Sequence, residues 1–130
     1  MNTYLDDRGR AYYDIFDGLP GQINYSVAYP GIVKAWHRHK HQTDYFFVAM
    51  GNARVALHDS EKGTTETHFI GEHNPQVIKI SPGIWHGYTC LGPEPCGLIY
   101  YVSRKYNPED PDEERASWDS FGYNWFPANK

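Results

Sequence analysis

Three histidines, His37, His39 and His41, alternate along one short segment of the chain. Successive side chains of a strand point to opposite faces, so an extended segment would place all three imidazoles on one face. Imidazole exchanges protons near neutral pH and binds transition metals, so this face could transfer protons or hold an ion. The alternative is the exposed polar face of an edge strand, which would carry no chemistry.

The residues around these histidines have a defined spacing: Gly31, five residues, His37-x-His39, four residues, Asp44, six residues and Gly51. This segment resembles the first motif of the cupins, G-x5-H-x-H-x4-E-x6-G, with Asp44 where the family usually has Glu. Because Asp is shorter than Glu, it has to reach further to act as a ligand.

Residues 81–87, SPGIWHG, resemble the second cupin motif, in which a Pro-Gly turn leads into a strand that carries the last ligand histidine, here His86. Cys90 stands where that motif ends in Asn. The resemblance implies that four side chains converge inside a barrel on a divalent transition metal such as Zn, Fe, Ni, Mn or Cu. The ligand set that it implies is His37, His39, Asp44 and His86.

Residues 32–126 also resemble the dTDP-4-dehydrorhamnose 3,5-epimerases, a branch of the cupins. The match lies in KAWH at 34–37, PGIWHGY at 82–88, LIYY and YNP within 98–108, and WD and YNWFP within 118–127. The resemblance implies a metal-free reaction in which a histidine removes the proton next to the C4 ketone and a tyrosine returns one to the other face. By position, His37 would be the base and Tyr100 the acid, with Tyr106 nearby.

This sequence departs from the epimerases at three positions of the active site. The family lysine that stabilises the enolate oxygen is absent from the neighbourhood of Gln42–Asp44. Lys34 stands where the family has the arginine that binds the diphosphate of the nucleotide. The acid partner of the family histidine follows the closing Trp-Pro, in a stretch that this sequence does not contain.

A further resemblance concerns His37-x-His39-Lys40 with Gly51 downstream, which is similar to the dTDP-4-keto-6-deoxyglucose 3,4-ketoisomerases. In that family two histidines of one strand shuttle a proton between adjacent carbons. The sequence thus combines an isomerase-like histidine pair with an epimerase-like C-terminal half.

These resemblances favour an enzyme, a nucleotide-sugar epimerase or isomerase that acts on a 4-keto-6-deoxyhexose linked to dTDP. Its two phosphates would require cations, and those assigned to the substrate are Lys34, Arg38, Lys79 and Arg104. One alternative is a metal-dependent isomerase, lyase or dioxygenase acting on a small oxygenated metabolite. Another is a non-catalytic cupin that binds a metal or a sugar. A His37 that holds a metal cannot also be the base, so its two roles exclude each other.

The elements expected to position these residues are about eight strands separated by turn signals such as Pro30-Gly31, Gly51-Asn52 and Pro82-Gly83. The strands are expected at 22–29, 32–39, 45–50, 53–58, 66–70, 76–80, 84–91 and 97–103. This pattern predicts an all-β domain, and the resemblance makes it a cupin-type double-stranded β-helix, or jelly-roll barrel. We expect one domain over 1–130, with an irregular N-terminal arm (1–20), the barrel (21–103) and a tail (104–130).

The tail begins with an acidic run, 107–114, that is not expected to form a strand. Five aromatic residues follow within 118–126, and exposing them to water would be unfavourable, so the tail should pack on the domain or on a partner subunit. Trp36 and Trp85 are expected at packing positions. Cys90 is interpreted as a small buried hydrophobic residue. The histidines expected outside the site, in a second layer or on the surface, are His41, His58, His68 and His73.

Composition excludes several other classes. The net charge of −4 argues against non-specific nucleic-acid binding, and no stretch has the length of a membrane span. The polar start does not resemble a secretory signal, and two cysteines are too few for a disulfide scaffold. We therefore expect a cytoplasmic homodimer with a small-molecule substrate and no organic cofactor, nucleic-acid partner or membrane partner.

Overall fold

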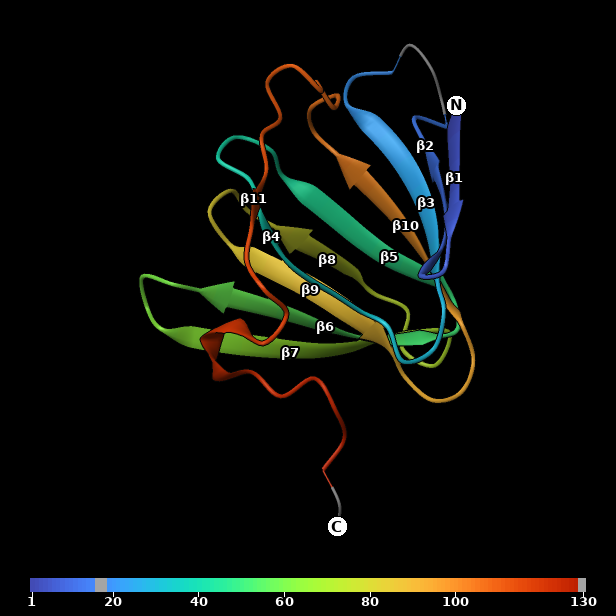
Figure 1. Ribbon diagram of the computed structural model, residues 1–130, viewed down its shortest axis with the longest axis vertical. Coiled ribbons are helices and arrows are strands. Elements are labelled where there is room, and N and C mark those ends of the chain that lie inside the picture. The colour runs from blue at the N-terminus through green and yellow to red at the C-terminus, as the bar shows by residue number, and fades with distance from the viewer. Residues whose placement is uncertain (16–18, 129–130) are drawn as a thin grey trace.

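Two antiparallel sheets form most of the computed structural model, which describes residues 1–15 and 19–128 (Figure 1). The first sheet contains, in spatial order, β1 (Asn2–Asp6), β2 (Gly9–Tyr13), β3 (Gln22–Ala28), β10 (Cys96–Val102), β5 (Asp44–Met50) and β8 (Val77–Ile80). The second contains β11 (Glu114–Arg115), β4 (Val33–Arg38), β9 (Trp85–Cys90), β6 (Asn52–Asp59) and β7 (Thr64–Gly71). A single 3-10 turn, η1 (Ser120–Gly122), follows in the tail. The predicted all-β, double-sheet fold is confirmed.

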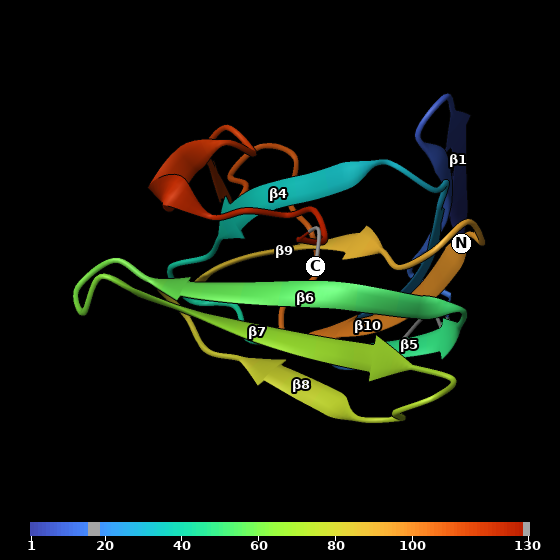
Figure 2. The ribbon, with the colours of Figure 1, turned by 90° about the horizontal axis from the view of Figure 1, so that it is seen from below.

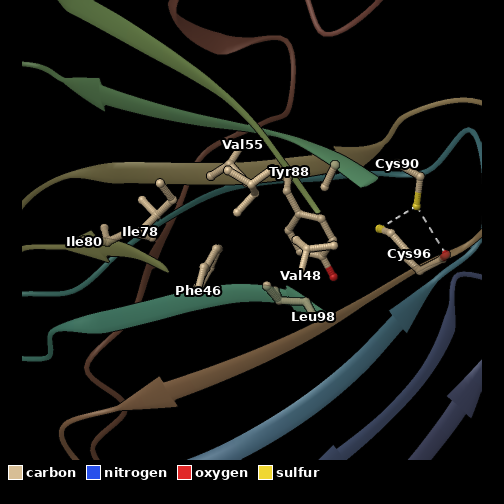
Figure 3. Packing of buried hydrophobic residues seen from close by; sticks show 12 residues of the cluster. Phe46, Val48, Val55, Ile78, Ile80, Tyr88, Cys90, Cys96 and Leu98 are labelled. Carbon is tan, nitrogen blue, oxygen red and sulfur yellow. Dashed lines mark hydrogen bonds between the residues drawn. The ribbon is translucent and has the colours of Figure 1, made fainter. Parts of the chain in front are cut away.

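Alternation along the strands directs one set of side chains into the space between the sheets. Phe46 and Val48 of β5 and Leu98 of β10 meet Val55 of β6 and Tyr88 of β9 there, and all five are buried (Figure 3). This burial of apolar surface holds the two sheets together. At one end of this interior space the inward-facing side chains are polar, and these form the candidate site.

The N-terminal arm is a β-hairpin rather than an irregular segment, which corrects the expectation for residues 1–20 over the part that the structure describes. Asp7 and Arg8 form its turn, and β2 pairs with β3. Neither turn residue has the positive φ of the common Asn-Gly or Asp-Gly hairpins; the turn has Asp6 at its first position and Gly9 at its last, the residues that a type I turn favours there. Gly9 is required where β2 meets β3, because its φ is +144° and a Cβ would lie 1.9 Å from the Val27 carbonyl oxygen.

The tail packs on the outer face of the second sheet of its own chain. Trp36 and Trp125 are fully buried there, with ring centroids 5.0 Å apart, and both indole N–H groups donate to the carbonyl of Trp118. Before this aromatic cluster the tail runs beside β4 (Figures 1 and 2). The acidic run was expected to lie outside any strand, but its last residue, Glu114, begins β11 and pairs with Arg38. This pairing brings the acidic residues to the histidine strand.

His58 also differs from expectation. Its position at the end of a predicted strand indicated a surface residue, whereas its ring is buried and stacks on Phe121 at 4.1 Å. The tail covers this ring, which explains why the strand pattern alone did not predict its burial. His41 and His73 are exposed, as expected, and His68 is partly so. Among the residues that the structure describes, no helix has the length and apolar character needed to cross a membrane.

Candidate active site

Three of the four predicted metal ligands converge at one end of the barrel interior. His39 follows the end of β4, Asp44 begins β5 and His86 lies in β9, so the group spans both sheets. Asp44 Oδ2 is 3.5 Å from Nε2 of His39 and 3.5 Å from Nε2 of His86. Asp44 and His86 are buried, and one ligand atom from each of the three residues lies within 4.8 Å of the others.

Hydrogen bonds at the far side of each ring orient the two imidazoles. His39 Nδ1 lies 2.5 Å from the carbonyl oxygen of Asp112, and His86 Nδ1 lies 3.1 Å from that of Ile84. A carbonyl can only accept, so both Nδ1 atoms carry hydrogen and both Nε2 atoms face Asp44. Gln42 Nε2 donates to the other oxygen of Asp44 at 2.7 Å.

The electrostatics of the three residues are those of a carboxylate between two imidazoles. Burial alone would raise the pKa of Asp44, but its hydrogen bonds to His39 and His86 hold it well below its usual range. Burial opposes the charge of His39, yet Asp44 raises the net pKa of that imidazole above its usual value. Asp44 is therefore ionised at neutral pH.

This donor set suits a divalent transition metal. Two imidazole nitrogens and one carboxylate oxygen are the ligands of many catalytic zinc sites, which keep a fourth position open. Ligand atoms about 2.0–2.2 Å from one ion lie roughly 3–3.6 Å apart, and the 3.5 Å separations fall within this range. The backbone acceptors at both Nδ1 atoms provide the outer support that metal-binding histidines usually have.

His37, the fourth predicted ligand, lies outside this group and has an acidic partner of its own. Its Nδ1 is 2.9 Å from Oε1 of Glu113 in the tail. The ring of His37 is 6.4 Å from that of His86, its pairing partner across β4 and β9. The hydrogen bond to His37 lowers the pKa of Glu113 to about 2, so this carboxylate is charged at neutral pH. With Nδ1 bound to Glu113, Nε2 becomes the basic nitrogen of His37.

Of the two predicted tyrosines, one lies in the barrel interior. Tyr100 of β10 contacts Phe46 at 5.9 Å, and Phe46 contacts His86 at 5.6 Å. Burial raises the pKa of Tyr100 well above 10, and the Tyr13 side chain adds to this effect, so the hydroxyl keeps its proton. Tyr106 is 64% exposed on the tail, and its backbone N–H donates to Gln22, so the structure does not bring its ring into the group.

The four cations assigned to the substrate lie in different places. Lys34 is half-buried in the barrel, where Nζ donates to Ser26 and burial lowers its pKa. Arg38 lies over the Trp85 ring and pairs with Glu114 on the outer face. The exposed Arg104 is 4.0 Å from Asp112, and Lys79 lies on β8.

Lys79 is the one of these four cations that lines a cavity next to the histidines. The cavity has a volume of about 210 Å³ and also contains Lys62, Leu57 and Ile80 among its lining residues. Leu57 pairs with His86, and Ile80 pairs with Asp44, so the cavity adjoins the three-residue group. Lys62 and Lys79 line it together with Asp59 and Glu66, so the charged side chains of the lining are of both signs.

Sequence reasoning missed the two tail residues that complete the site, Asp112 and Glu113. Besides its carbonyl bond to His39, Asp112 accepts hydrogen bonds through its carboxylate from the backbone N–H groups of Lys40, His41 and Gln42, at 2.7–3.0 Å. It therefore holds the turn between β4 and β5 in place. The signal available in the sequence was an acidic run directly before aromatic residues that had to pack on the domain.

Comparison with known proteins identifies relatives over most of the chain. Residues 4–114 match the family model described as the polysaccharide biosynthesis C-terminal domain. The spore coat polysaccharide biosynthesis protein SpsL of Bacillus subtilis is 42% identical over 112 residues, which are 81% of this chain and 74% of SpsL. The probable low-salt glycan biosynthesis epimerase Agl13 of Haloferax volcanii is 41% identical, over 92% of this chain and 84% of its own.

Solved structures show the same fold at lower identity. The capsular polysaccharide assembling protein CapF of Staphylococcus aureus superimposes with a TM-score of 0.81 at 24% identity, over 88% of this chain but 31% of CapF. This chain therefore spans about a third of that protein. A dTDP sugar isomerase of Desulfovibrio desulfuricans gives a TM-score of 0.76 at 24% identity, over 98% of this chain and 88% of its own. Both likenesses support the cupin-type barrel.

Proposed function

The chain belongs to the family of the polysaccharide biosynthesis C-terminal domain, and from this premise we propose that it is a sugar-nucleotide epimerase or isomerase. The substrate that we propose is a 4-keto-6-deoxyhexose linked to dTDP. The name of the 41% identical Agl13 supports the reaction class. The observation that carries the proposal is the His37–Glu113 pair beside the group of His39, Asp44 and His86.

In this mechanism Nε2 of His37 removes a proton from the carbon next to the ketone. Glu113 fixes the ring through Nδ1 and stabilises the imidazolium that forms, in the role of the acid partner that the epimerase resemblance lacked. Because His37 is outside the three-residue group, the base and the ligand roles can belong to different histidines. In this proposal His37 is only the base, and the metal ligands are His39, Asp44 and His86.

The returning proton comes from Tyr100. Its raised pKa keeps the hydroxyl protonated, and β10 and β4 belong to opposite sheets, so acid and base would approach a bound sugar from different sides. Transfer from Tyr100 to the carbanion carbon would then invert that centre. A divalent metal bound by His39, Asp44 and His86 would supply positive charge to the enolate oxygen, which the family lysine does elsewhere.

The experiment that tests this proposal is solvent exchange. A panel of dTDP- and UDP-linked 4-keto sugars is incubated with the protein in D2O, and deuterium at C3 and C5 is followed by NMR and mass spectrometry. The proposal predicts enzyme-dependent exchange and a new epimer or keto isomer with at least one sugar. Tight binding without exchange across the panel would contradict it and would favour a non-catalytic binding protein.

A metal-dependent enzyme of another kind is the second candidate, and the three-residue donor set favours it. The panel for this candidate contains small oxygenated metabolites without a nucleotide. Turnover of such a compound that is lost on chelation, with no exchange in any sugar nucleotide, would favour this candidate over the epimerase.

A further inference from the structure

The two cysteines of the chain meet at the junction of the two sheets. Cys90 is the last residue of β9 and Cys96 the first of β10, and a five-residue loop joins them. Their sulfur atoms are 2.7 Å apart, and both thiols are free (Figure 3). Cys96 has no exposed surface and Cys90 is 9% exposed. A disulfide has an S–S length of about 2.05 Å, so a small shift of the side chains would allow a bond.

The surroundings of Cys90 distinguish it from its partner. As a thiol it donates to the carbonyl of Ala28 at 3.3 Å, a hydrogen bond that favours the protonated form. Lys34, whose Nζ is held by Ser26 in the same interior, carries a positive charge that favours the thiolate form of Cys90. The hydrogen bond with Cys96 and this charge together lower the pKa of Cys90, against the effect of burial. The same hydrogen bond and burial raise the pKa of Cys96, so Cys96 remains a thiol.

We propose that Cys90 and Cys96 form a reversible dithiol–disulfide pair that is oxidised by a small hydroperoxide and links the two sheets covalently. The Cys90 thiolate attacks one peroxide oxygen, the O–O bond breaks, and the released hydroxide or alkoxide takes up a proton. The resulting sulfenic acid is attacked by Cys96, which loses its proton as the S–S bond forms and water leaves. Hydrogen peroxide, which accepts the two electrons of the dithiol, ends as two molecules of water.

The bond would connect the strands that carry the candidate site. His86 lies four residues before Cys90 on β9, and Tyr100 lies four residues after Cys96 on β10. Oxidation would therefore fix the separation of these two strands at one end of the barrel. Because the bond restricts the unfolded chain, we expect the melting temperature to rise by about 4 °C or more.

The test is made on the whole protein with hydrogen peroxide and does not depend on the proposed enzymatic function. Reduced protein is treated with a small excess of peroxide, unfolded in a thiol-alkylating buffer and weighed intact. The predicted product has lost two hydrogen atoms, carries no alkyl group and regains two alkylatable thiols after dithiothreitol. Since the chain has two cysteines, a monomer of this mass can contain only the Cys90–Cys96 bond.

Single substitutions then test the order of the steps. Cys96→Ser should stop at a sulfenic acid on Cys90, which a dimedone probe traps, whereas Cys90→Ser should leave Cys96 unmodified. Two alkylated thiols after peroxide treatment of the wild type would overturn the proposal. A sulfinic acid without a disulfide, or a disulfide-linked dimer, would overturn it as well, and these wild-type results hold even if a variant fails to fold.

Discussion

His37 Nδ1 lies 2.9 Å from Glu113 Oε1, although the two residues are 76 positions apart in the chain. The contact depends on the tail, whose two-residue strand β11 pairs with the end of β4 and so delivers Glu113 to the histidine strand. An acid partner placed in this way gives His37 a defined tautomer and a basic Nε2.

Glu113 should act as a positioning residue for His37. We expect Glu113→Gln to lower kcat by about 10- to 100-fold with little change in KM, because the imidazolium loses its counter-charge while the substrate contacts remain. The matched control is Glu114→Gln, whose side chain pairs with Arg38 on the outer face instead. Steady-state kinetics over a range of pH measure both variants. Equal losses in the two variants would contradict this role, and so would an unchanged pH profile for Glu113→Gln.

Tyr100 should return the proton without removing one. In Tyr100→Phe, His37 can still exchange the substrate proton with solvent from its own face, but the centre cannot receive a proton from the other side. We therefore expect deuterium to enter the substrate while the yield of inverted product falls by about 100-fold or more. NMR of the sugar distinguishes the two outcomes. Loss of exchange together with inversion would show that Tyr100 is not the acid.

Stability at low pH should depend on Glu113. Its pKa is about 2 in the folded chain and about 4.5 when unfolded, so between these values the unfolded chain binds more protons. The contribution of Glu113 to stability is complete above about pH 5 and is lost as pH falls toward 2. Denaturant titrations from pH 7 to 2 should show a smaller decrease for Glu113→Gln than for the wild type. Parallel curves would contradict the assignment.

The group of His39, Asp44 and His86 should bind about one divalent metal per chain. Protein purified without a tag or chelator is analysed by inductively coupled plasma mass spectrometry, and His39→Gln and His86→Ala are expected to lose the metal. His41→Ala is the control, because His41 is exposed. Circular dichroism verifies that each variant is folded. Wild-type protein that stays free of metal after incubation with zinc would argue against a metal site here.

The spacing of polar and apolar residues predicted the eight barrel strands, because most of them alternate and most of the turns between them contain a glycine or proline. The resemblance to the two cupin motifs, rather than this spacing, implied that His37, His39, Asp44 and His86 meet, and the structure brings the last three together. The N-terminal hairpin escaped prediction because β1 is exposed along most of its length, so the strand has no alternating apolar face.

The position of the tail on the domain could not be predicted from the sequence. Its aromatic residues required packing, but their position on the second sheet depends on Trp36, which lies more than eighty residues earlier. Only that packing decides which of several acidic residues reaches His37 and which contacts the turn at 40–42. For the same reason the burial of His58 under Phe121 could not be inferred from its own strand.

If His37 is the base, its replacement should stop the exchange of the substrate proton with solvent, and two histidine variants measure this. His37→Asn and the control His41→Asn are each incubated in D2O with a 4-keto sugar nucleotide that the wild type exchanges. We predict that His37→Asn reduces the exchange rate by at least about 100-fold while His41→Asn remains within about twofold of the wild type. Exchange at the wild-type rate in a folded His37→Asn variant would contradict the central claim.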